Sequence, residues 1–276
     1  MTADVWSDGV RGWWIALSAI SLMNLTLLGA TGRRVAALGA EAAAERRARR
    51  RQLALSSLFV VGCAFRSFLP RAEGQRICLF DTWWSSAILS RTVATVAELA
   101  LVTQWTLVLL EWSHACGIRY GQLVARALLP LIAGAEICSW YTTLTTNFAG
   151  SVIEESTWAV TSTLMTGTLL VLWLRHRPAR RLFVGASIVL NTAYIVFMWS
   201  VDVPMYLGRH RTDTGIGKAY LSVADGFRDA ASRRVVTRRW EDWRPEIPWM
   251  SLYFSAGVWI SLALVRAPRF GHDAGS

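Results

Sequence analysis

Charged and aromatic residues lie inside the long apolar stretches of this 276-residue chain, at spacings that place them on single helix faces. Within the stretch 83–112, steps of seven, four, three and seven residues connect Trp84, Arg91, Thr95, Glu98 and Trp105. A charged side chain at the centre of a bilayer costs at least about 2.5 kcal/mol, so such residues usually face other protein or water. We therefore expect this face to point toward polar groups on other helices.

Three further apolar stretches carry similar stripes, and another ends in arginines. The stripes, spaced at three or four residues, are Glu136, Trp140, Thr143 and Asn147; Glu155, Trp158, Ser162 and Thr166; and Asn191, Tyr194, Met198 and Asp202. The stretch that ends near residue 70 finishes in Arg66, Ser67 and Arg71. Because lipid does not solvate such side chains, we expect the stripes to face one another. The sequence thus predicts a polar intramembrane cavity, open to the extracytoplasmic side.

These residue types suit the binding or conversion of an amphiphilic or anionic, lipid-like molecule. The candidate catalytic acids and bases are Glu98, Glu136 and Glu155, since burial favours a protonated carboxyl group. The same carboxylates could hold a hard divalent metal, and the pattern selects no particular cofactor. Arginines hold anions through forked hydrogen bonds. The candidate ligand-binding residues are Arg66, Arg71, Arg91, Trp140, Trp158, Asn191, Tyr194 and Asp202.

A purely structural role is the alternative for each of these residues. Arg91 and Glu98 are two turns apart, about 10.5 Å along a helix axis, so we do not expect them to pair directly. Each is expected to pair with another span, for instance Arg91 with Glu136 or Asp202, and so to fix helix packing. Stripes of serine, threonine and tryptophan also serve ordinary packing between helices.

Two other functions remain open, a proton- or cation-coupled transporter or channel and a seven-helix sensor. Several membrane protein families are excluded because this chain lacks the residues that they require within a span. A retinal protein needs a lysine within a span, and the one lysine, Lys218, lies in a long connection. Zinc hydrolases and serine–histidine proteases need histidines inside spans, but His114, His176, His210 and His272 lie at span ends or in tails.

The elements that must position these residues are membrane-spanning helices, which makes the protein all-α. About 20 apolar residues cross the hydrocarbon core of a bilayer as a helix. The sequence predicts seven spans in a single domain covering residues 1–276: 12–31, 53–70, 83–112, 123–147, 153–174, 182–205 and 248–266. Asp81 is the expected N-cap of the third span. The acidic leading segment disfavours a cleaved signal peptide, so the first span is expected to stay in the membrane.

Arginine placement predicts the orientation. Residues 32–52 hold seven arginines and residues 175–181 hold four more, and both segments lie on one side if there are seven spans. By the positive-inside rule that side is the cytoplasm, which places the N-terminus outside and the C-terminus inside. The preference for arginine over lysine is typical of GC-rich bacteria, so the expected location is a bacterial inner membrane.

The connection 206–247 carries nine basic residues against six acidic ones and is placed outside in this topology. Residues 217–239 repeat apolar positions at helical steps, with arginines mostly on other faces. This pattern predicts an amphipathic helix on the membrane surface or a solvated cap over the bundle. The expected partners are the lipid bilayer and a lipid or small-molecule ligand, and no nucleic acid is expected.

Overall fold

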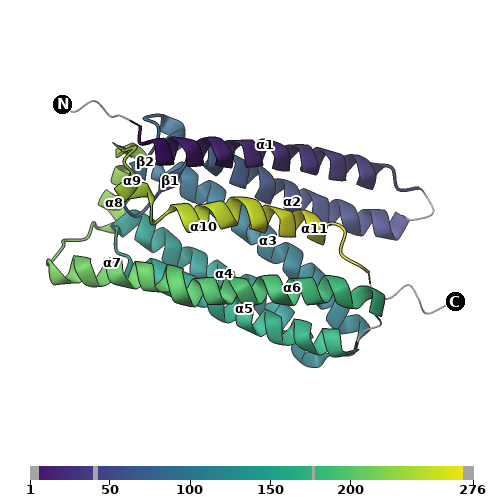
Figure 1. Cartoon of the computed structure of the whole chain (residues 1–276). Helices are drawn as coiled ribbons and strands as arrows, with labels where there is room; N and C mark the ends of the chain where they lie inside the picture. Colours follow the sequence, from purple (N-terminus) through teal and green to yellow (C-terminus); the bar gives the residue numbers. More distant parts are fainter. Residues whose placement is uncertain (1–5, 40–42, 176–177, 270–276) are drawn as a thin grey trace. The chain divides into compact units, whose positions relative to one another are not determined.

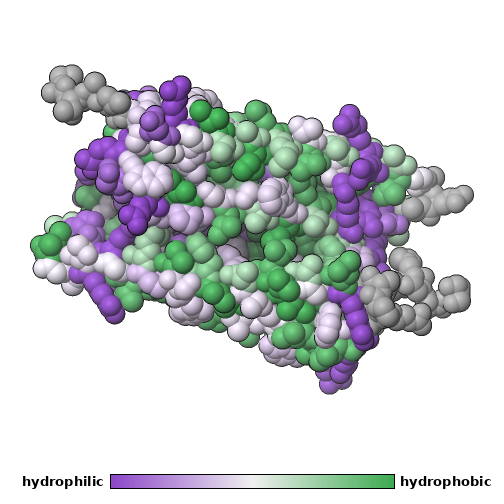
Figure 2. All heavy atoms as spheres, viewed as in Figure 1, coloured by the Kyte–Doolittle hydropathy of each residue, from purple (hydrophilic) through white to green (hydrophobic). Residues whose placement is uncertain are grey.

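The computed structural model describes residues 6–39, 43–175 and 178–269, and the described chain is mostly helical. Within these described ranges, six helices are long and apolar enough to cross a membrane: Asp8–Ala36, Ala87–Ala115, Arg119–Thr145, Ala149–Arg175, Arg181–Gly215 and Ile247–Leu264. Figure 2 shows apolar side chains along the helices and hydrophilic ones gathered at helix ends. These features indicate a multi-pass membrane protein. His176 and His272 lie outside the described residues, as does Arg177 of the arginine-rich segment 175–181.

The first two helices, α1 (Asp8–Ala36) and α2 (Ala43–Phe68), lie side by side as a hairpin (Figure 1). Ser7 caps α1, because its hydroxyl accepts a hydrogen bond from the Val10 amide at 3.3 Å. α2 is absent from the six candidate spans above. Its N-terminal half carries arginines, which leaves only its second half apolar. A seventh span at α2 therefore stays a prediction.

The third span begins with a short 3₁₀ turn, η2 (Trp83–Ser85), before α3 (Ala87–Ala115). The predicted N-cap role of Asp81 is wrong. Its carboxylate accepts a hydrogen bond from the Arg234 Nε atom at 2.6 Å, and Thr82 precedes η2 instead. Helix α4 (Arg119–Thr145) follows, and α5 runs over Ala149–Arg175.

The next predicted span is longer than expected. It consists of α6 (Pro178–Phe197), a π-helical turn η3 (Met198–Asp202) and α7 (Val203–Gly215). Pro204 lies in the first turn of α7, directly after η3. α5 and α6 lie side by side (Figure 1). The last span is also interrupted, as α10 (Ile247–Leu252), the π-helical turn η4 (Tyr253–Gly257) and α11 (Val258–Leu264).

A small cap of short elements connects the helices. The strands β1 (Arg71–Ala72), β2 (Ile77–Cys78) and β3 (Val235–Val236) form one sheet, antiparallel between β1 and β2 and parallel between β2 and β3. Helices α8 (Val223–Ser232) and α9 (Trp240–Trp243) flank β3. Of the predicted surface helix 217–239, only α8 is helical, because the chain pairs with β2 directly afterwards.

The described chain divides into two compact units, which are treated separately below. The first unit comprises Met1–Leu101, Trp140–Asn147 and Gly217–Val265. The second unit comprises Val102–Ser139, Phe148–Ile216 and Arg266–Ser276. The core of the first unit is a cluster of buried apolar side chains from α1, α2 and the last span, including Leu17, Phe59, Phe254 and Val258.

Candidate functional site

The polar face of α3 in the first unit holds a buried ion pair. The Arg91 Nη2 atom lies 3.2 Å from the Glu98 Oε1 atom, and both side chains are largely buried. The expectation that these residues do not pair directly is therefore wrong. The two backbone positions are two turns apart, but both side chains are long and extend toward each other along the axis. Arg91 and Glu98 therefore form an ion pair within one helix.

Two further residues of the predicted stripes join this pair. The Trp140 indole donates to the Thr95 hydroxyl at 3.1 Å, and the Arg91 Nε atom donates to the same hydroxyl at 3.5 Å. Trp140 comes from the last turns of α4, which belong to the first unit. The structure thus brings Arg91, Thr95, Glu98 and Trp140 together, as the spacing of the stripes indicated.

A second buried ion pair lies beside the first. The Arg66 Nη2 atom donates to Glu73 Oε1 at 2.9 Å, and the Ser90 hydroxyl donates to the same oxygen at 2.6 Å. Desolvation alone would raise the pKa of Glu73, but the charges of Arg66 and Arg91 lower it below its ordinary value. Glu73 is not among the residues predicted from the sequence, because it lies between β1 and β2, outside the apolar stretches. The sequence offers one indication that Glu73 is important, namely its position five residues after the end of α2.

Close packing and aromatic rings enclose this network. A β-carbon on Gly62 would lie 3.0 Å from the Ala97 β-carbon, so glycine allows α2 to approach α3 closely. The Arg66 guanidinium lies over the rings of Trp249 and Phe254, at 5.7 Å and 5.6 Å from their centroids. Cation–π contacts of this kind stabilise a desolvated arginine. Two arginines and two glutamates thereby form a charge-balanced cluster in an apolar surrounding.

Arg71, a predicted anion-binding residue, lies in the cap. Its guanidinium donates to the backbone carbonyl of Ser85, to that of Arg233 at 2.9 Å and to that of Arg76 at 3.5 Å. Arg76 has a positive φ of 63° and is held by its own side chain. That side chain donates to Asp229 at 2.7 Å and to the Thr143 carbonyl at the end of α4 at 2.6 Å. These arginines tie the cap to the helix ends.

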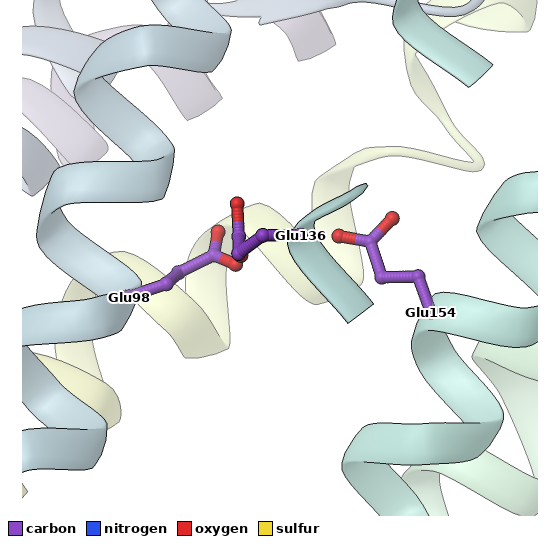
Figure 3. Close-up of side chains that lie close together, drawn as sticks. All are labelled: Glu98, Glu136 and Glu154. Atoms are coloured by element: carbon purple, nitrogen blue, oxygen red, sulfur yellow. The ribbon is translucent and has the colours of Figure 1, made fainter. Parts of the chain in front are cut away.

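The second unit contains a pair of buried carboxylates. Glu136 of α4 and Glu154 of α5 are 3% and 6% exposed. Their closest carboxylate oxygens lie within 4.8 Å of each other, and Figure 3 shows Glu154 extending toward Glu136. Glu98, labelled in the same close-up, belongs to the first unit and pairs with Arg91. Two buried acids on neighbouring segments of one unit therefore lie close together.

Glu155, the residue of α5 predicted as a catalytic acid or base, is only partly buried, whereas the preceding Glu154 is buried. The buried polar residues of α5 are Ser151, Glu154, Thr161, Ser162 and Thr168. Of the predicted stripe, Ser162 is buried, while Glu155, Trp158 and Thr166 are partly buried. Adjacent residues of a helix differ by about 100° in direction, so the choice between two successive glutamates decides which one is buried. Sequence periodicity gave no means of separating the two.

Asn191 links α6 to α5. Its amide nitrogen donates to the Ser162 carbonyl at 2.8 Å and to the Thr166 hydroxyl at 2.6 Å, so the predicted stripes of these two helices meet here. Asp202 is buried at the end of η3, Trp158 is partly buried and Tyr194 is exposed. The structure brings together Asn191, Ser162 and Thr166, while Tyr194 faces outward.

The two units differ in their buried charged side chains. Among the described residues, those of the first unit carry both signs: Arg66, Arg71, Arg76, Arg91, Glu98 and Glu246. Those of the second unit are Glu136, Glu154 and Asp202, all acidic. Comparisons with protein-family models, with curated proteins and with solved structures find no match for this chain.

Proposed function

We propose that this multi-pass membrane protein binds a proton or a cation at the Glu136–Glu154 pair, as part of proton- or cation-coupled transport. The observation that carries the proposal is the approach of two buried carboxylates to within 4.8 Å. Both lie on helices that are apolar enough to span a membrane.

The physical reason is repulsion between like charges in a poorly solvating medium. At 4.8 Å and an effective dielectric constant of about 20, two negative charges repel by about 3.5 kcal/mol. Each ionised carboxylate also loses hydration on burial. One proton on the pair, or a cation between the two groups, removes the repulsion. Carboxylate pairs that share one proton in this way are familiar from aspartic proteases.

Binding of a lipid-like anion in an extracytoplasmic cavity stays a prediction from sequence, and the geometry favours it less. The guanidinium groups that it requires already bind protein acceptors. Arg66 pairs with Glu73, Arg91 pairs with Glu98 and Arg71 donates to carbonyl groups. We also propose that the protein has seven spans including α2, that its N-terminus lies outside, and that it resides in a bacterial inner membrane.

Flux measurements in proteoliposomes test the proposal. We expect Glu136→Gln and Glu154→Gln each to abolish uptake of protons, or of a coupled alkali cation, driven by a membrane potential. Glu155→Gln is the matched control, because it changes the adjacent, partly buried glutamate of the same helix. Equal flux through wild type and both single variants, with all proteins folded, contradicts the proposal.

A further inference from the structure

A cluster of arginines lies where the α1–α2 hairpin closes, in the first unit. It consists of Arg33 and Arg34 in the last turn of α1 and of Arg46, Arg47, Arg49, Arg50 and Arg51 in the first half of α2. The two helices approach closely here, since a β-carbon on Gly32 would lie 3.8 Å from Leu53 Cδ2. Figure 2 shows hydrophilic side chains at this end of the hairpin. The two arginine sets thus converge.

Two of the seven arginines have structural partners. Arg46 donates to the Leu38 carbonyl at 3.3 Å, and Arg49 donates to Glu45 and to the Val265 carbonyl, each at 2.8 Å. The remaining five, which we call the exposed arginine set, are Arg33, Arg34, Arg47, Arg50 and Arg51. Within the described ranges, no ion pair involves a member of this set.

The closely spaced arginines of α2 destabilise this helix when no anion is bound to them. Arg46 and Arg50, and likewise Arg47 and Arg51, are like charges four residues apart, which destabilises a helix. The cations also begin at the fourth residue of α2, near the positive end of its macrodipole. Bound anions would offset both effects.

The position of the exposed arginine set relative to the predicted spans indicates which kind of anion it binds. Arg33 follows the predicted end of the first span by two residues, and Arg51 precedes the predicted second span by two. At 1.5 Å per residue, both lie about 3 Å beyond the apolar stretches along the helix axes. That level corresponds to the phosphate groups of the lipid leaflet.

We propose that the exposed arginine set is a binding site for the phosphate groups of anionic phospholipids. Guanidinium forks match phosphate oxygens in geometry and charge. Several arginines converging from two helices can contact more than one headgroup at once. This site is separate from the Glu136–Glu154 pair and does not depend on its function.

Thermal unfolding of the full-length protein in neutral detergent tests the proposal. The probes are phosphatidylglycerol, phosphatidylcholine and free inorganic phosphate. We expect phosphatidylglycerol to raise the melting temperature, with little effect from phosphatidylcholine, and the shift to shrink as salt screens the charges. Inorganic phosphate at equal phosphorus concentration should give a smaller shift, since it lacks anchoring in the micelle. Equal shifts for both lipids, or a shift that salt leaves unchanged, overturn the proposal.

A charge-removal variant assigns the effect to these residues. We expect Arg47→Gln/Arg50→Gln/Arg51→Gln to weaken phosphatidylglycerol binding at least about tenfold. The matched control removes three exposed arginines of the cap, as Arg228→Gln/Arg233→Gln/Arg244→Gln. If the first variant fails to fold, the triple substitution to lysine replaces it and should retain salt-sensitive binding. Unchanged affinity in the first variant, or an equal loss in the control, overturns the proposal.

Discussion

The Nη2 atom of Arg91 lies 3.2 Å from Oε1 of Glu98, seven residues later on the same helix. Both groups are buried in an apolar stretch, and Arg91 also donates to Thr95. The two opposite charges therefore neutralise each other within one helix. The ion pair also holds the polar side chains on this face of α3 in place.

We predict that Glu98→Gln destabilises the protein by about 3–5 kcal/mol, because it leaves the Arg91 charge buried without its counterion. The double variant Arg91→Gln/Glu98→Gln should lose less than the sum of the single losses, since the two groups are coupled. Denaturant unfolding in detergent measures these differences. Glu155→Gln, at a partly buried position, should change stability little. Strictly additive losses would refute the coupling.

The interaction of Glu73 with Arg66 predicts a pH dependence. The pKa of Glu73 is lowered in the folded protein from an ordinary value of 4.5. Its contribution to stability is therefore complete above about pH 4.5 and is lost as pH falls through the folded-state pKa. We expect Glu73→Gln to be less stable than wild type at neutral pH, with the difference narrowing in acid. A stability difference independent of pH between 7 and 3 is the contrary result.

The face of α3 could be predicted from sequence because spacings of seven, four and three residues return to one side of a helix. The same reasoning could not detect Glu73, which acts on the helices from a short connection between strands. It also could not separate Glu154 from Glu155, since one residue of register decides which is buried. The cap was only partly predictable: α8 lies within the expected helix, but pairing of Val235 and Val236 with β2 ends the helical region.

Asn191 should be important for the packing of α5 against α6. Its amide makes hydrogen bonds to Ser162 and Thr166, and Asn191→Ala removes both. We expect a loss of about 1–3 kcal/mol, because two hydrogen bonds between the helices are removed at a buried position. Asn147→Ala is the control, since the Asn147 amide donates a 3.3 Å hydrogen bond to Tyr141 at an exposed position. Equal stability of the two variants would count against this role.

The seven-span topology predicts opposite sides for two exposed positions. In a background without the native cysteines, a cysteine at position 47 should be labelled only from the cytoplasm. A cysteine at position 232 should be labelled only from outside. The reason is that α2 must cross the membrane to bring the cap to the outer face. Labelling of both positions from the same side would show that α2 does not cross the membrane. The predicted orientation of either the α1–α2 hairpin or the cap would then be wrong.

The protonation state of the Glu136–Glu154 pair tests the central proposal most directly. Infrared spectroscopy on protein with isotope-labelled glutamate, in buffer free of metal cations at neutral pH, detects the carbonyl band of a protonated carboxyl group. We predict this band in wild type and in Glu155→Gln, and its loss in Glu136→Gln/Glu154→Gln. A wild-type protein without the band under these conditions, or a double variant that retains it, would contradict a shared proton at this pair.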